Sequence, residues 1–233
     1  MIQVNSHELA EDFEIEIGEP FTAPGHLEVR VFDIWQKEKM IQGDRLTNGT
    51  IYSLLEHNDK LLSIQSCEFQ FVLAGRRDSS LAGDGLLVRP VAVTGIVFCA
   101  EGLVLGRRGG GVSDDVGLWE PVPAGGLAQE NPERQMYEEL AEELGLSADM
   151  VNFVKACGLV EDTSSRVFDI VYRVNTSLMA EDVFNAHRLC KTAEHSELAI
   201  VKEGELNSFL KTNSENLLPA LPSMLRIAGL IEN

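Results

Sequence analysis

Three glutamates within one short stretch carry the chemistry that this sequence suggests most directly. Glu139, Glu142 and Glu143 recur at i, i+3 and i+4, so they share one face of a helix. Carboxylates crowded in this way repel one another at neutral pH. Hard cations such as Mg²⁺ or Mn²⁺ relieve that repulsion by binding the oxygens. The spacing therefore predicts a metal site on an acidic helix, and the simpler alternative is a solvated acidic face.

The residues around these glutamates predict how the helix begins, ends and packs. Leu140 and Leu144 continue an apolar stripe beside the acidic face. Asn131 and Pro132 suit the N-cap and the first helical turn, and Gly145 suits a left-handed residue at the C-terminus. We expect one amphipathic helix between Asn131 and Gly145, with its apolar side against a core.

The rest of the chain alternates expected strands with expected helices, which favours a layered α/β or α+β domain. Strands are expected at residues 13–17, 27–32, 91–98, 103–108, 151–163 and 165–176, and in two stretches of 50–69 joined at 57–59. Helices are expected at 33–41, in part of 71–85 and in the tail 214–233, and residues 197–210 turn from strand to helix. A domain boundary is expected near residues 83–89.

Composition limits the class of protein and of partner. The chain has 233 residues, of which 44% are hydrophobic and 24% charged, which is typical of a soluble globular protein. Its formal charge of −18 argues against a nucleic acid polymer as partner. A small anionic substrate would need metal ions or a local arginine cluster. The four cysteines form no CxxC pair, and no signal peptide or membrane span is evident, so we expect a cytoplasmic protein with reduced thiols.

Residues Gly125–Leu146 resemble the signature of the Nudix hydrolases, G-x5-E-x7-R-E-U-x-E-E-x-G-U, where U is an apolar residue. Here Gly125 is followed after four residues by Glu130 and after seven more by Glu138, and the stretch from Glu138 reads EELAEELGL. The first loop is thus one residue shorter than in the signature. Glu138 also stands where the family has an arginine that helps hold the glutamates in place. The resemblance covers roughly residues 89–206.

This resemblance implies a fold and a domain order. The fold class would be α/β (α+β), a Nudix-type α/β/α sandwich with a mixed sheet, plus a smaller N-terminal α+β region. We expect the N-terminal region at residues 1–88 and the Nudix domain, with a C-terminal helix, at 89–233. The N-terminal part also faintly resembles the leading domain of a Nudix subgroup that cleaves UDP-sugars.

The resemblance also implies site residues. Glu139 and Glu143 would be the principal ligands of Mg²⁺ or Mn²⁺, with Glu142 as ligand or general base, and all three would be catalytic. The carbonyl of Ala124 would be a further ligand, whereas Glu130 would be structural. A late carboxylate from a loop is often added in the family, and the candidates are Glu161, Asp162, Glu194 and Glu197.

Arginines are the candidates for binding the substrate and for balancing Glu138. Arg107, Arg108 and Arg166 suit phosphate contacts because the guanidinium fork matches phosphate oxygens, and any of them could supply the positive charge missing at Glu138. Alternatively Arg134, four residues before Glu138, forms an exposed helical pair with it. His57, His187 and His195 have no partner at ligand spacing, so they receive no role.

The expected function is metal-dependent hydrolysis of a nucleoside diphosphate linked to another moiety, with a UDP-sugar first and ADP-ribose or a dinucleotide next. The second hypothesis is a Nudix-fold nucleotide-binding or regulatory module without hydrolysis, which Glu138 favours. An isomerase of prenyl diphosphates is a third, and it would need a catalytic cysteine that Cys99 and Cys157 do not obviously provide. The expected partner is a small molecule, with no nucleic acid and no membrane, and a homodimer is left open.

Overall fold

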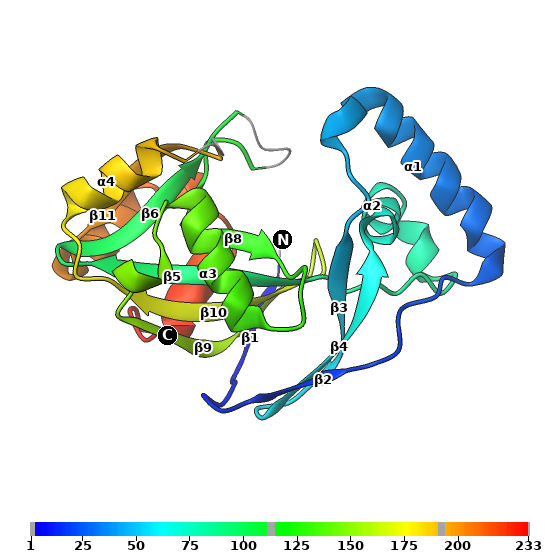
Figure 1. The fold of residues 1–233 in the computed structure, drawn as a ribbon, viewed down its shortest axis with the longest axis horizontal. Coiled ribbons are helices and arrows are strands. Elements are labelled where there is room, and N and C mark those ends of the chain that lie inside the picture. The colour runs from blue at the N-terminus through cyan, green and yellow to red at the C-terminus, as the bar shows by residue number, and fades with distance from the viewer. Residues whose placement is uncertain (1–2, 111–114, 191–193, 233) are drawn as a thin grey trace.

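A computed structural model describes residues 3–110, 115–190 and 194–232, which form two sheets with helices around them (Figure 1). The larger sheet has the order β1-β9-β10-β5-β6-β11, with β7 paired to β6 and β8 paired to β5. Strands β10 and β5 are parallel, whereas their other neighbours are antiparallel, so the sheet is mixed as predicted. Its strands are β1 (Val4–His7), β5 (Val91–Cys99), β6 (Gly102–Arg108), β7 (Trp119–Pro121), β8 (Ala124–Gly126), β9 (Phe153–Asp162), β10 (Val167–Asn175) and β11 (His195–Val201).

Helices cover both faces of the larger sheet. On one face α3 (Pro132–Glu143) and α4 (Ala180–Arg188) pack in the same apolar cluster as alternate residues of β5 and β10. On the other face α5 (Leu206–Thr212) and α6 (Leu221–Ile227) pack on the intervening residues of the same strands, such as Ile96 of β5 and Val171 of β10. Side chains alternate across a strand, so the near-continuous apolar run of β5 follows from burial on both faces. The predicted α/β/α sandwich is therefore confirmed.

The smaller sheet belongs to the N-terminal part and has the order β2-β4-β3. Its elements are β2 (Glu14–Ile17), β3 (Thr50–His57), β4 (Leu61–Glu68), α1 (Glu28–Gln42) and α2 (Phe69–Arg77). Leu54 and Leu62 of this sheet lie in the same apolar cluster as Val93 of the larger one, and β1 pairs with β9 in the larger sheet. The two sheets thus share a core, and the division at residue 88 stays a prediction.

Two expectations about local structure need correction. Residues 27–32 were expected as a strand because apolar residues alternate there, but Leu27 ends a 3-10 turn and residues 28–32 begin α1. That prediction was wrong because Leu27 and Val31, one helical turn apart, pack on Ala74 of α2, so tertiary contact decided between the two periods. The C-terminal helix is shorter than expected and starts at Leu221, with Pro222 in its first turn.

Among the described helices, none is long and apolar enough to cross a membrane.

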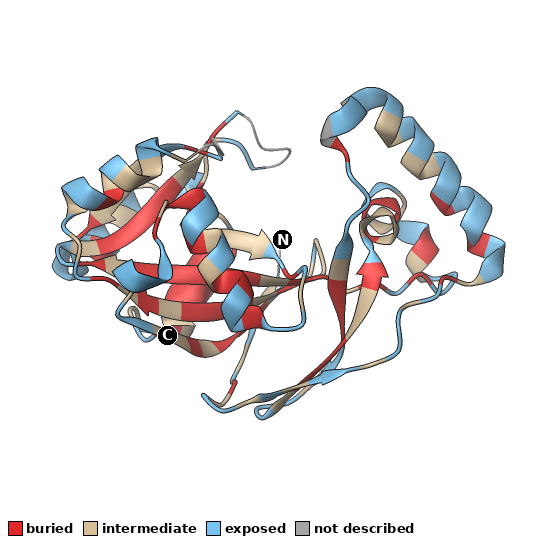
Figure 2. Cartoon of the chain, viewed as in Figure 1, coloured by how far each residue is buried: buried red, intermediate tan, exposed pale blue. Residues whose placement is uncertain are grey.

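Helix α3 has the ends and the packing that its sequence predicts. The Asn131 side chain accepts a hydrogen bond of 3.0 Å from the Arg134 amide, and Pro132 occupies the first turn. Gly145 has a φ of 69° just past the helix. Leu140 is fully buried, and Figure 2 shows the alternation of buried and exposed residues along this helix. One face of α3 is therefore held against the sheet while the other reaches the surface.

The N-cap predicts a measurable contribution to stability. Asn131→Ala should lower the free energy of unfolding by about 1 kcal/mol, because the Arg134 amide loses its acceptor. Urea unfolding followed by circular dichroism measures this, with Asn131→Asp as the matched control that keeps an acceptor oxygen. An alanine variant as stable as the aspartate variant would mean that the cap contributes nothing.

Candidate functional site

The turn at Gly125 seats the first glutamate of the acidic face. Strand β8 lies beside α3, and a Cβ placed on Gly125 would overlap the carboxylate of Glu139. Gln135 fixes this contact, because its Nε2 donates to Glu139 Oε1 over 2.7 Å while its own Oε1 accepts from the Ala128 amide over 3.1 Å. The glycine is thus required by the close approach of the helix, and its loop and the helix are joined by side-chain hydrogen bonds.

Glu143 is held more deeply between helix and turn. Its side chain is 4% exposed, and Oε1 accepts a hydrogen bond of 3.2 Å from the Ala124 amide. Its other oxygen, Oε2, is buried without a hydrogen-bond partner among the described residues. The main-chain carbonyl of Glu143 lies 2.8 Å from Nδ1 of His187 in α4. The end of α3 is therefore tied both to β8 and to α4.

Burial makes the two inner carboxyls hard to ionise. Loss of solvent raises the pKa of Glu143 from its usual 4.5 to about 9, and the nearby charge of Glu194 adds to the rise. Burial likewise raises the pKa of Glu139 to about 7, against the opposing effect of the Gln135 hydrogen bond, and Glu142 and Glu194 contribute further. Cations near such groups favour their ionised form.

The structure brings together only part of the predicted acidic set. Glu142 is exposed beside half-buried Glu139 and buried Glu143, and Glu194, just before β11, acts electrostatically on the latter two. Glu130 is exposed in the loop before α3. The other late carboxylates lie elsewhere and contact different residues: Glu161 contacts Asn5, Asp162 contacts Ser164, and Glu197 contacts Arg107.

Glu138 lies outside the buried site. Its side chain is 46% exposed and pairs with Arg134 at 3.3 Å, and it also accepts from Gln129 at 2.7 Å. Of the two alternatives for its balancing charge, the structure therefore has the local helical pair. Such an exposed pair contributes only about 0.3–0.5 kcal/mol, so it adds little to the stability of α3.

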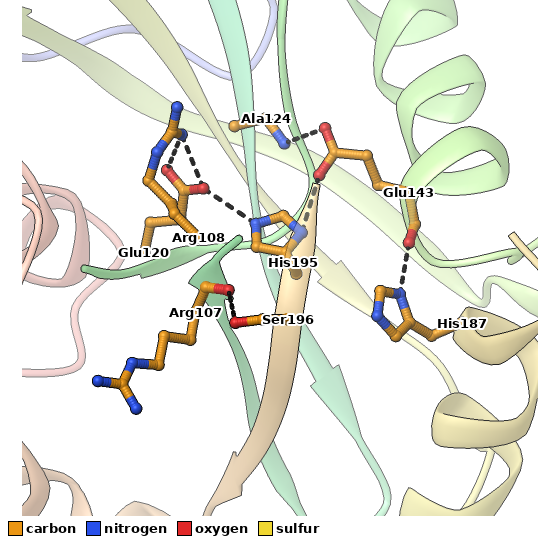
Figure 3. A network of polar contacts seen from close by, with 8 residues as sticks. All are labelled: Arg107, Arg108, Glu120, Ala124, Glu143, His187, His195 and Ser196. Atoms are coloured by element: carbon orange, nitrogen blue, oxygen red, sulfur yellow. Dashed lines mark hydrogen bonds and ion pairs between the residues drawn. The ribbon is translucent and has the colours of Figure 1, made fainter. Parts of the chain in front are cut away.

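The three predicted substrate-binding arginines have different surroundings. Arg108 is 21% exposed and binds Glu120 with its guanidinium, at 2.7 Å. Arg107 is 43% exposed, lies 3.6 Å from Glu197 and points away from Glu120 in Figure 3. Arg166 lies in the turn between β9 and β10 and lines a cavity of about 170 Å³ with residues of α2. None of the α3 glutamates lines that cavity, so Arg166 is not brought to the acidic site.

The sequence-based prediction missed His195, which lies between two buried glutamates. Its Nε2 is 2.9 Å from Glu120 Oε1, and its Nδ1 is 3.6 Å from Glu143 Oε2 (Figure 3). Glu120 comes from β7, His195 from β11 and Glu143 from α3. No local spacing could reveal this contact, because the pairing of β11 and β7 with β6 creates it.

The donor set suits a hard divalent cation. Oε2 of Glu143 is a buried carboxylate oxygen without a partner, and Glu139, Glu142 and the Ala124 main chain provide further oxygens beside it. Mg²⁺ and Mn²⁺ bind carboxylate and carbonyl oxygens of this kind. Within the described residues no three acidic, histidine or cysteine side chains already form a closed metal cage, so binding would require side-chain rotation.

Comparison with known proteins finds similarity in structure. No protein-family model and no curated protein sequence matches the chain. Similar solved structures include the NUDIX domain of Shewanella oneidensis NrtR complexed with ADP ribose, which is 16% identical with a TM-score of 0.47 over 65% of this chain and 95% of that one. The M. smegmatis Nudix hydrolase RenU is 17% identical with a TM-score of 0.43, over 62% and 90% of the two chains.

A third similar structure is the Francisella tularensis bifunctional NMN adenylyltransferase/ADP ribose pyrophosphatase complexed with AMP and a Mn ion. It is 17% identical with a TM-score of 0.46, and the match covers 68% of this chain and 46% of that one. The similar structures thus include Nudix proteins, the family that residues 125–146 resemble. At these identities and TM-scores the likeness assigns no substrate or activity to this chain.

The buried carboxyl of Glu143 predicts a pH dependence of stability. In the folded protein it keeps its proton up to about pH 9, whereas the unfolded chain releases it near pH 4.5. The native state therefore binds more protons in this window, and the free energy of unfolding falls as the pH rises through it. Glu143→Gln removes the ionisable group, so the metal-free variant should lose less thermal stability than the wild type between about pH 6 and about pH 9.

Differential scanning calorimetry in the presence of a chelator measures this effect. Glu138→Gln is the matched control, because that carboxyl is exposed, and its pH profile should follow the wild type. Parallel profiles for Glu143→Gln and the wild type would show that Glu143 ionises in the fold as it does in the unfolded chain.

Proposed function

We propose that this chain is a member of the Nudix hydrolases that cleaves the pyrophosphate of a nucleoside diphosphate linked to another moiety. The observation that carries the proposal is the seating of Glu139 and Glu143 against the Ala124–Gly125 turn, with Glu142 exposed beside them. Buried Glu143 and half-buried Glu139 favour a binding site over a solvated acidic face. It concentrates oxygen ligands where a diphosphate and its cations can approach.

Glu139, Glu143, Glu142 and the carbonyl of Ala124 are the residues that would hold Mg²⁺ or Mn²⁺. Such a cation neutralises charge on a diphosphate and polarises the reacting phosphorus. The chain's own part is to hold these oxygens in place, through the Gln135 and Ala124 hydrogen bonds. Exposed Glu142 is the carboxylate that can take a proton from the attacking water, and Arg107 is the more exposed cation for a phosphate oxygen.

The reaction is the addition of one water across a P–O–P anhydride. One phosphorus gains the hydroxyl oxygen, and the other leaves with the bridging oxygen. The products are a nucleoside monophosphate and a phosphorylated moiety. For a UDP-sugar, the leading substrate of this proposal, these are UMP and a sugar 1-phosphate; for ADP-ribose they are AMP and ribose 5-phosphate.

A panel of substrates tests the proposed activity. UDP-glucose, ADP-ribose and NADH are incubated with the protein and Mg²⁺, and the products are separated by chromatography. Turnover of one class with the products named above supports the proposal. A folded protein that turns over none of them, with Mg²⁺ or with Mn²⁺, contradicts it.

A nucleotide-binding module without hydrolysis is the second candidate, because Glu138 leaves the acidic face without the arginine of the signature. Calorimetric binding of a nucleotide in the presence of Mg²⁺, with no product formed over hours, would favour it. Isomerase chemistry gains no support from Cys157, which packs on the face of the sheet covered by α5 and α6, opposite α3.

Replacing the exposed glutamate tests the general-base role. Glu142→Gln should lower kcat by at least about 10²-fold, because an amide cannot accept the proton of the attacking water. Glu138→Gln, which changes an exposed carboxylate paired with Arg134 on the same helix, should stay within a few-fold of the wild type. Equal rates for Glu142→Gln and the wild type would remove Glu142 from the mechanism.

A further inference from the structure

A continuous line of charged and polar side chains runs from the surface into the acidic site. Arg108 of β6 binds Glu120 of β7 at 2.7 Å, and Glu120 lies 2.9 Å from Nε2 of His195 in β11. Nδ1 of His195 then faces Oε2 of Glu143 at 3.6 Å. Figure 3 shows the four side chains in this order, with the imidazole between the two carboxylates.

The inner members of this network are almost fully buried. The exposed fraction of the side chain is 2% for His195, 4% for Glu143 and 5% for Glu120. Buried charge is costly unless it is paired. Arg108 and Glu120 carry opposite charges and lie 2.7 Å apart. The charge of buried Glu120 is therefore compensated by Arg108.

The backbone is shaped to hold the imidazole in this orientation. A Cβ placed on Gly106 would overlap the His195 ring, so the ring lies directly over the β6 main chain. Glu120 is the register partner of Gly106 in the β6–β7 pair. Because Glu120 holds Nε2, rotation of the imidazole ring is restricted and Nδ1 is directed at Glu143.

We propose that His195 is a positioning residue that holds the Glu143 carboxylate in the orientation needed at the acidic site, with Glu120 and Arg108 holding His195. This inference rests on the proposed function, because it gives Glu143 a ligand role there. The two oxygens of Glu143 then have partners on two sides: Oε1 accepts from the Ala124 amide, and Oε2 faces the imidazole at 3.6 Å. His195 acts only through Glu143 and touches no substrate.

Fold stability alone is a poor explanation for this arrangement. Replacing a buried ionic network by apolar side chains of similar volume is often neutral or stabilising. Here, moreover, Nδ1 of His195 and Oε2 of Glu143 both lack a hydrogen-bond partner among the described residues. Two buried polar atoms that face each other just beyond hydrogen-bond distance suit a site in which a small rotation of Glu143 accompanies cation binding.

The test compares His195→Gln and Glu120→Gln with His26→Gln. His26 is exposed and lies in the N-terminal part of the chain, so this variant is the matched control. Mn²⁺ affinity is measured by electron paramagnetic resonance without substrate, and kcat and KM are measured separately. We expect Mn²⁺ binding to weaken about 10- to 100-fold in His195→Gln, as for other residues that orient metal ligands. We also expect kcat to fall with little change in KM. The variant that combines His195→Gln and Glu120→Gln should lose no more Mn²⁺ affinity and kcat than His195→Gln alone, since both residues act through one network.

The outcomes separate this inference from the proposed function. If the wild type turns over substrate while folded His195→Gln keeps its Mn²⁺ affinity and kcat within twofold, the inference is overturned and the function stands. If the wild type hydrolyses nothing, the function fails, but the Mn²⁺ affinities still decide the inference.

A measurement on the wild type covers the case in which His195→Gln does not fold. Nitrogen-15 resonances of the imidazoles are followed during addition of Mg²⁺. The His195 signals should shift in the wild type and stay fixed in Glu143→Gln, whereas His26 should not respond in either. A His195 signal that ignores Mg²⁺ while the protein binds it would overturn the inference.

Discussion

The contact between the Glu143 carboxylate and the Ala124 amide is the constraint on which the site depends. It requires α3 to lie against β8, which in turn requires a glycine under Glu139. Burying two carboxyls is unfavourable, as the raised pKa values of both show. The apolar side of the helix opposes this cost, because Met136 and Leu140 are fully buried against the sheet. The helix is thus anchored by its apolar stripe while its acidic end is kept in an unfavourable environment.

The side chains that contact the buried glutamates come from other strands. Arg108 and His195 lie on neighbouring strands, opposite each other in the β6–β11 register, and β7 adds Glu120 beside them. In a chain with a net charge of −18, such local placement matters more than the total number of basic residues. Glu138, by contrast, pairs with Arg134 on the exposed side of α3, so the substitution of an arginine by an acid falls where solvent screens it.

Most of the fold could be predicted, since long periodic segments with clear ends determine their own structure. The β5–β6 hairpin, the β9–β10 pair and α3 lie where the pattern of apolar residues and the turn residues put them. The first turns of α1 could not be predicted, because Val29 and Val31 alternate as in a strand. Only the contact with α2 favours a helix there. Helix α4 was not predicted at all, although its His187 binds the end of α3.

The candidate site, too, was determined partly by the sequence and partly by the tertiary structure. The sequence by itself determined the acidic face, the glycine turn and the helix ends, because each depends on spacings of a few residues that local geometry converts into proximity. Only the tertiary structure decided that Glu143 is buried, that Glu194 lies near it and that Arg166 does not. It alone placed His195 between Glu120 and Glu143, because that contact depends on the register of three strands far apart in the chain. Register is set by the packing of whole sheet faces, which no short motif encodes.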